Sequence, residues 1–188
     1  MISNLERLQE IEHIVVLMLE NRSFDHMLGY LSLPESAGGR GRSDIDGLTG
    51  APDQFNAYDG DIYTPQPLHG YLSFPWDPPH DYKYVVKQIA RNNGGFVEQF
   101  AKHHGQLYKR LPLEDPGLVM GYHTADHVPA FDQLAAQFCV CDRWFSSLPG
   151  PTFPNRYYAL AGTSRGYVQD PDVNDPAPVD LKIVFDYM

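Results

Sequence analysis

Two short polar segments carry the side chains best suited to chemistry. They are residues 20–26 (ENRSFDH) and residues 150–156 (GPTFPNR), and each follows a short run rich in apolar residues. We expect each to be the turn at the end of a buried strand, the place where ligands of α/β sheets bind. The first turn offers a carboxylate and an amide, and the second offers a hydroxyl. The sequence therefore predicts that the two turns form two sides of one ligand-binding site.

Glu20 and Asn21 present oxygen atoms directly after the first apolar run. Carboxylate and amide oxygens suit an oxygen-preferring cation or zinc. Such ligands alone do not separate Ca²⁺, Mg²⁺ and Zn²⁺. Alternatively, Glu20 pairs with Arg22 or caps the helix that follows, and the residues alone leave both interpretations open.

Thr152 lies between Pro151 and the pair Phe153-Pro154, so its backbone is restricted on both sides. A rigidly held hydroxyl is what a nucleophile requires, and a metal ion could replace the missing neighbouring base by lowering the hydroxyl pKa. The alternative is an ordinary turn threonine. Asn155 and Arg156 could donate hydrogen bonds to phosphate oxygens or simply stabilise the loop.

The histidines indicate a catalytic or metal-binding role less clearly than the two polar segments do. His80, in the run PPHD at 78–81, could act as a general acid near neutral pH, or it could be a solvated loop residue. His123 and His127 have the i, i+4 spacing of a metal pair on a helix. Because no HExxH motif is present and Pro129 follows at once, we do not predict zinc there.

The elements that position these residues follow an α/β pattern of strand, polar turn and helix. A continuous apolar run predicts a buried strand over 11–19, and Ser23 is the expected N-cap of a helix over 23–31. The rest of the chain is expected to form an irregular loop (34–79), a helix broken near Gly94-Gly95 (82–104), a helix (129–137), a second buried strand (138–144), a helix that ends at Gly162 (157–161), an acidic loop (166–180) and the start of a new element (181–188).

Composition narrows the class of protein. A chain of 188 residues fits one domain, and a net charge of −10 with a pI near 5.1 argues against general nucleic-acid binding. No apolar run is long enough to span a membrane, and no signal peptide is evident. We therefore expect a cytoplasmic protein, or a secreted or periplasmic one if the N-terminus is incomplete. Cys139 and Cys141 are expected to be buried thiols that act as small hydrophobic residues, with no disulfide between them.

Four segments, taken in order along the chain, resemble the bacterial and plant phospholipase C and acid phosphatase A family of phosphoesterases. They are residues 14–26 (IVVLMLENRSFDH), 79–81 (PHD) with 93–96 (NGGF), 141–164 with the runs CDRWF, GPTFPNR and GTS, and 183–187 (IVFDY).

This resemblance implies an α/β fold that is an alkaline-phosphatase-like, three-layer α/β/α sandwich, and hydrolysis of phosphomonoesters or phosphodiesters. It implies that Glu20 and Asn21 bind a divalent metal ion whose identity is open. Thr152 would be both a metal ligand and the nucleophile, passing through a phosphoenzyme. His80 would lie near the leaving group, and Asn155 and Arg156 would support the loop and the phosphate.

The sequence departs from the family at its C-terminus, where the family's late acidic motif and the Asp-His pair after it are absent. We therefore expect residues 1–188 to be the N-terminal part of a single catalytic domain, with an incomplete sheet and with a missing C-terminal half that completes the site. A non-catalytic remnant or a phosphate- or metal-binding module is the alternative. The substrate would be a phosphate ester or a phospholipid head group. Aromatic residues of the loop 34–79 could stack on a choline-type group or only pack the loop.

Overall fold

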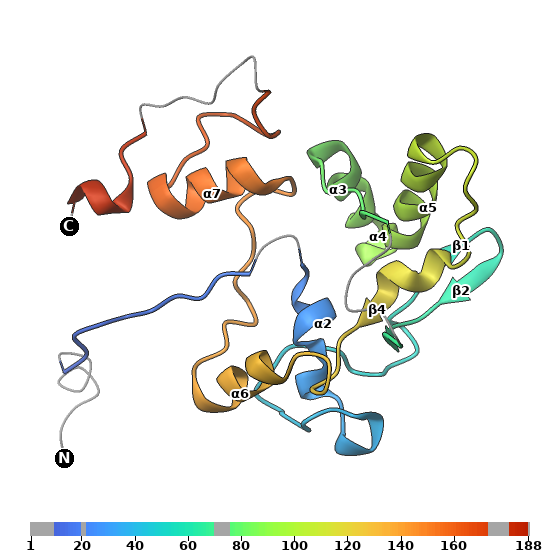
Figure 1. The fold of residues 1–188 in the computed structure, drawn as a ribbon, viewed down its shortest axis with the longest axis horizontal. Helices are drawn as coiled ribbons and strands as arrows, with labels where there is room; N and C mark the ends of the chain where they lie inside the picture. The colour runs from blue at the N-terminus through green and yellow to red at the C-terminus, as the bar shows by residue number, and fades with distance from the viewer. Residues whose placement is uncertain (1–9, 20–21, 70–75, 173–180, 188) are drawn as a thin grey trace.

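The computed structural model describes residues 10–19, 22–69, 76–172 and 181–187. Within these ranges the fold is mixed α/β, with short helices and two small sheets of two strands each. Figure 1 shows α3 (Tyr82–Gln88), α4 (Ala90–Asn93) and α5 (Phe96–Leu107) beside the hairpin formed by β1 (Asn56–Tyr58) and β2 (Asp61–Tyr63). It also shows α2 (Phe24–Met27) near α6 (Pro129–Gln137), with α7 (Thr152–Ala161) set apart from both groups. The described residues contain neither the large sheet nor the three layers that the family resemblance implies.

The first hydrophobic core lies where α2 (Phe24–Met27) and the 3-10 helix Gly29–Ser32 pack against α6 (Pro129–Gln137). Tyr30 and Leu31 are buried at its centre. Phe24, Met27 and Leu28 also contact this core, as expected from their spacing. The helix predicted over 23–31 is confirmed, although its second half winds more tightly than an α-helix.

The caps of these helices also follow the sequence. The side-chain oxygen of Ser23 accepts a hydrogen bond from the N–H of His26 at 3.2 Å, so the predicted N-cap is confirmed. The bounds of α6 agree with the predicted helix over 129–137.

The second core lies under α5. The predicted break near Gly94-Gly95 is confirmed, because the segment forms α3 (Tyr82–Gln88), α4 (Ala90–Asn93) and α5 (Phe96–Leu107). Phe100 of α5 is buried there, with Leu68 and Leu118 beside it.

A pair of very short strands connects the two cores. β3 (Gln66–Pro67) pairs in parallel with β4 (Gly121–Tyr122), and the N–H of Leu68 donates to the carbonyl oxygen of Tyr122 at 2.9 Å. One residue further on, the N–H of His123 donates to the carbonyl oxygen of His26 at 2.8 Å. The chain after β4 is thereby fixed to α2.

The prediction of two buried strands, over 11–19 and 138–144, is wrong for this structure. Neither segment forms a strand, and Ile14 and Val15 are 83% and 91% exposed. Residues 10–19 run extended, away from the helices (Figure 1). A strand requires a neighbour for its backbone groups, and no strand of the described residues lies beside either segment. For the same reason Cys139 and Cys141 are exposed thiols instead of buried ones.

The loop 34–79 contains a hairpin that the sequence analysis missed. β1 (Asn56–Tyr58) and β2 (Asp61–Tyr63) are antiparallel around Asp59 and Gly60, whose φ angles are 52° and 90°. An Asp-Gly pair between two short β-prone runs is the usual signal for such a turn, because both positions need positive φ.

Candidate active site

Thr152 is the first residue of α7 (Thr152–Ala161), so the helix begins earlier than the predicted 157. Pro151 supplies an extended N-cap, and Pro154 lies in the first turn, where a missing N–H costs no helical hydrogen bond. The helix ends at Gly162 as predicted. Thr152 is half-buried at the positive end of the helix dipole, where an anion is stabilised.

Asn155 holds the loop that leads into α7. Its Oδ1 atom accepts a hydrogen bond from the N–H of Leu148 at 3.1 Å. Its amide nitrogen is shared among three carbonyl oxygens, those of Leu148 at 3.1 Å, Gly150 at 3.2 Å and Pro151 at 3.1 Å. The side chain therefore fixes the backbone next to Thr152. Arg156 is the next residue of the helix and has an exposed side chain.

Asp170 reaches the same helix start from the loop after α7. Its Oδ1 atom accepts a hydrogen bond from the N–H of Phe153 at 2.8 Å. This N–H is one of the helix donors that lack an intrahelical partner. Sequence reasoning missed the contact, because 17 residues of chain separate the two partners and no spacing rule links them.

His80 lies just before α3 and is half-buried. Its Nδ1 atom donates to the carbonyl oxygen of Pro78 at 3.1 Å, which leaves Nε2 as the atom that can exchange a proton. The carboxylate of Asp77 lies 3.8 Å from the same Nδ1 atom. Gln88 of α3 anchors the turn by donating to the carbonyl oxygen of Pro79 at 2.7 Å.

A close approach at Gly150 connects the loop before Thr152 with the segment that carries His80. A β-carbon at this position would lie 2.5 Å from Cδ1 of Leu148 and 3.6 Å from Cβ of Tyr82. Any larger residue here would have to displace the end of the Leu148 side chain. Tyr82 begins α3 two residues after His80, so the loop before Thr152 packs against the segment that carries the histidine.

The other two predicted ligands, Glu20 and Asn21, lie outside the described residues. Within the part of the chain that the structure describes, no group of three or more His, Cys, Asp or Glu side chains could hold a metal ion. The set Glu20, Asn21 and Thr152 has the donor chemistry of an oxygen-preferring site, with one carboxylate, one amide and one hydroxyl.

The sequence of this chain matches a known family over nearly its whole length. Residues 11–187 match the sequence model of the phosphoesterase family. The chain belongs to the phosphoesterase family. This match confirms the family resemblance that the sequence motifs indicated.

Several curated phosphoesterase relatives are phospholipases C by name. The chain is 34% identical to non-specific phospholipase C6 of Arabidopsis thaliana over 163 residues, which cover 83% of this chain and 28% of that protein. It is 30% identical to hemolytic phospholipase C of Pseudomonas aeruginosa, with coverage of 82% and 19%. It is 30% identical to phospholipase C B of Mycobacterium tuberculosis, with coverage of 92% and 32%. The chain thus spans about a third or less of the length of these relatives.

Two further features of this phosphoesterase chain bear on its site. His26, His123 and His127 form a row of rings with centroids 4.7 and 5.7 Å apart, a contact that the i, i+4 spacing alone did not predict because it requires α2. In addition, no helix among the described residues is both long and apolar enough to cross a membrane.

Proposed function

We propose that this chain supplies the nucleophile-bearing part of a phosphoric ester hydrolase of the phospholipase C or acid phosphatase type. Membership of the phosphoesterase family supports the class of reaction. The observation that carries the proposal is Thr152, at the N-terminus of α7 on a loop that Asn155 holds by four hydrogen bonds. A hydroxyl fixed beside a helix N-terminus is well placed to attack a phosphorus atom.

In this mechanism the Thr152 hydroxyl gives up its proton to water and its oxygen attacks phosphorus. The bond from phosphorus to the ester oxygen breaks, and the phosphoryl group passes to Thr152. His80 gives a proton from Nε2 to the leaving oxygen, which otherwise would depart as an alkoxide. Water then cleaves the phosphothreonine and restores the hydroxyl. Asn155 keeps the loop in place, and Arg156 offers a forked donor to phosphate oxygens.

The proposed metal ligands are Glu20, Asn21 and Thr152. A divalent ion bound there would lower the pKa of the threonine hydroxyl and neutralise phosphate charge. Three ligands with one carboxylate bind a divalent ion weakly, so we propose that further acidic ligands come from outside this chain. Ca²⁺, Mg²⁺ and Zn²⁺ all remain compatible with this donor set.

We further propose that residues 1–188 form the N-terminal part of an alkaline-phosphatase-like, three-layer catalytic domain. Two observations support this. The relatives are at least about three times as long as the matched segment, and the apolar residues 14–18 are exposed although their composition suits a buried strand. The substrate would be a phosphate ester or a phospholipid head group.

The experiment compares Thr152→Ala with Thr152→Ser in the longer protein that this proposal requires. With p-nitrophenyl phosphate and p-nitrophenylphosphorylcholine as substrates, we expect Thr152→Ala to lower kcat by about a thousandfold or more, because a nucleophile has no substitute. Thr152→Ser keeps a hydroxyl and should retain measurable turnover and a trappable phosphoenzyme. Equal activity of both variants and the wild type would refute the role of Thr152 as the nucleophile.

A control experiment separates the enzyme from a non-catalytic module. Isolated residues 1–188 should show little turnover, and extension of the chain along its reading frame should restore it. Phosphate or metal binding without turnover in the extended protein would instead favour a binding module. A reading frame without any continuation would argue against the proposed longer enzyme.

A further inference from the structure

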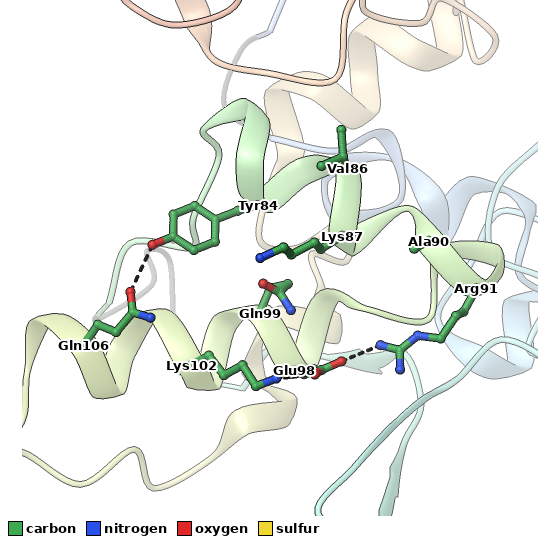
Figure 2. A pocket seen from close by; sticks show the side chains of 9 residues that line it. All are labelled: Tyr84, Val86, Lys87, Ala90, Arg91, Glu98, Gln99, Lys102 and Gln106. Carbon is green, nitrogen blue, oxygen red and sulfur yellow. Dashed lines mark hydrogen bonds and ion pairs between the residues drawn. The ribbon is translucent and has the colours of Figure 1, made fainter.

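A groove lies between α3 and α4 on one side and α5 on the other (Figure 2). Its volume is about 420 Å³. No residue of α7 and no residue of the turn around His80 lines it. The groove is therefore separate from the candidate active site.

The charge of this groove is opposite to that of the chain. Its lining includes Lys87, Arg91 and Lys102, and among the described residues the only carboxylate that lines it is Glu98. The local charge at neutral pH is thus +2, whereas the whole chain carries −10. Such a concentration of positive charge on an acidic protein attracts anions to one place.

Glu98 organises two of the three cations. One of its oxygens lies 2.5 Å from the guanidinium of Arg91 and the other lies 2.5 Å from the ammonium of Lys102. Hydrogen bonds from Lys102 and Arg91 hold the pKa of Glu98 below its usual range, so it is ionised at neutral pH. A single carboxylate between two cations leaves one positive charge uncompensated.

Lys87 adds the second uncompensated charge. No carboxylate among the described residues lies within ion-pair distance of its ammonium group. Figure 2 shows this ammonium extending from α3 into the space between Tyr84 and Gln99. At the far end, the hydroxyl of Tyr84 donates to Oε1 of Gln106 at 3.1 Å and so leaves the Gln106 amide nitrogen as a further donor.

The backbone that carries Arg91 is strained. Arg91, Asn92 and Asn93 have φ angles of 57°, 55° and 62°, a left-handed run that L-residues rarely adopt. The buried side chain of Asn56 stabilises the run by donating to the carbonyl oxygen of Asn93 at 3.0 Å. The turn brings Arg91 to Glu98, seven residues later. Strain of this kind is concentrated at functional sites.

We propose that this groove binds the dianionic phosphate group of a small phosphate ester. A phosphate monoester carries a charge near −2 at neutral pH, which matches the +2 of the groove. Lys87 supplies a point charge, and Arg91 supplies a planar fork that suits phosphate oxygens. The ligand competes with Glu98 for Arg91 and Lys102, and its second negative charge gives it the advantage over a carboxylate.

The phosphate group has two possible sources, a soluble monoester or the head group of a lipid with a terminal phosphate. The same chemistry recognises both. The proposal does not depend on hydrolysis at Thr152, since the groove shares no residue with that site.

The test titrates inorganic phosphate into the ¹⁵N-labelled 188-residue chain, below the concentration at which it self-associates and with EDTA to prevent metal-mediated binding. We expect saturable amide shifts over residues 87–102. Lys87→Gln should weaken binding about tenfold, the effect of one charge-assisted contact. Lys182→Gln, the same charge change at an exposed residue outside the groove, should leave it unchanged.

The direction in which Glu98→Gln changes the phosphate affinity is the decisive result. It removes the competing carboxylate and raises the groove charge to +3, so phosphate should bind more tightly, provided that circular dichroism shows unchanged helix content. A purely structural ion-pair network predicts no gain. Equal affinities for Lys87→Gln and Lys182→Gln, or no gain with Glu98→Gln in a folded chain, would overturn the proposal.

Binding to lipid vesicles distinguishes the two possible sources of the phosphate group. Co-sedimentation with phosphatidylcholine vesicles that contain phosphatidic acid, reversed by Lys87→Gln, would identify a lipid phosphate. Saturable binding of glycerol phosphate without vesicle binding would identify a soluble ester. Failure of both ligands would refute the site.

Discussion

The most strongly perturbed histidine in the structure is His123. It is 5% exposed, and its Nδ1 atom has no hydrogen-bond partner among the described residues. Burial, together with the neighbouring His26, His127 and Arg22, lowers the pKa of His123 to about 4. Burial lowers the pKa of His26 as well, against the hydrogen bond that its Nδ1 donates to the Gly121 carbonyl oxygen at 2.8 Å. Both rings are therefore neutral at the junction of α2 and β4.

Because these rings are uncharged in the folded chain, we expect the fold to be less stable in mild acid. A histidine with a normal pKa near 6.5 takes up a proton in the unfolded chain, whereas folded His123 does not until about pH 4. The free energy of unfolding should fall as the pH falls from about 6.5 to about 4, by about 2 kcal/mol between pH 7.5 and pH 5. Urea unfolding at these two pH values measures the loss.

His123→Phe should remove most of this dependence, because the ring no longer titrates. His69→Gln, at an exposed position, serves as the control and should retain it. An unchanged pH dependence in His123→Phe would show that another group is responsible.

At the scale of elements, α7 and its loop form the best-defined part of the candidate site. The loop has no regular structure of its own between 148 and 151, and Asn155 supplies its backbone with hydrogen bonds that a helix or sheet would otherwise provide. The position of Thr152 therefore depends on one amide side chain three residues along the same helix.

Asn155→Asp tests this dependence with almost no change of shape. The carboxylate cannot donate, and it faces the carbonyl oxygens of Leu148, Gly150 and Pro151. We expect a loss of about 2 kcal/mol in the free energy of unfolding, and faster hydrogen exchange of the Leu148 amide. Asn92→Asp, the same change at an exposed position, should cost far less. Equal losses in the two variants would contradict the role of Asn155.

The sequence predicted those elements whose signals are local. The Ser23 cap, the break near Gly94-Gly95, α6 and the end of α7 at Gly162 each follow from a few neighbouring residues. The strands over 11–19 and 138–144 were predicted wrongly, because strand formation depends on partners that periodicity does not identify. The contacts of Asp170 with α7 and of His26 with His123 join distant segments, so no spacing rule could identify them.

At the scale of the whole molecule, the chain exposes much apolar surface. Ile14 and Val15 are joined by Val16, Leu17 and Met18 in one extended exposed run, and Phe145 is 78% exposed. Continuous apolar runs with unpaired backbone groups promote association between chains. Net charge of −10 opposes this association but is spread over the entire sequence.

We therefore expect the isolated chain to self-associate. Sedimentation velocity should detect oligomers that increase with protein concentration, and the double variant Val15→Asp/Leu17→Asp should shift the chain toward the monomer. Gln133→Asp/Gln137→Asp adds the same charge at exposed positions of α6 and controls for charge alone. A wild-type chain that is monomeric at every concentration would contradict this expectation.

The contact between Asp170 and the first turn of α7 has a consequence for how an anion could approach Thr152. The N–H of Phe153 already donates to a carboxylate that belongs to the same chain. A phosphate oxygen that takes this N–H must first displace Asp170, at a cost comparable to one hydrogen bond to a charged group, about 1.5–3 kcal/mol. Binding at this helix start is then an exchange of one anion for another, and the loop that carries Asp170 is released whenever the exchange occurs.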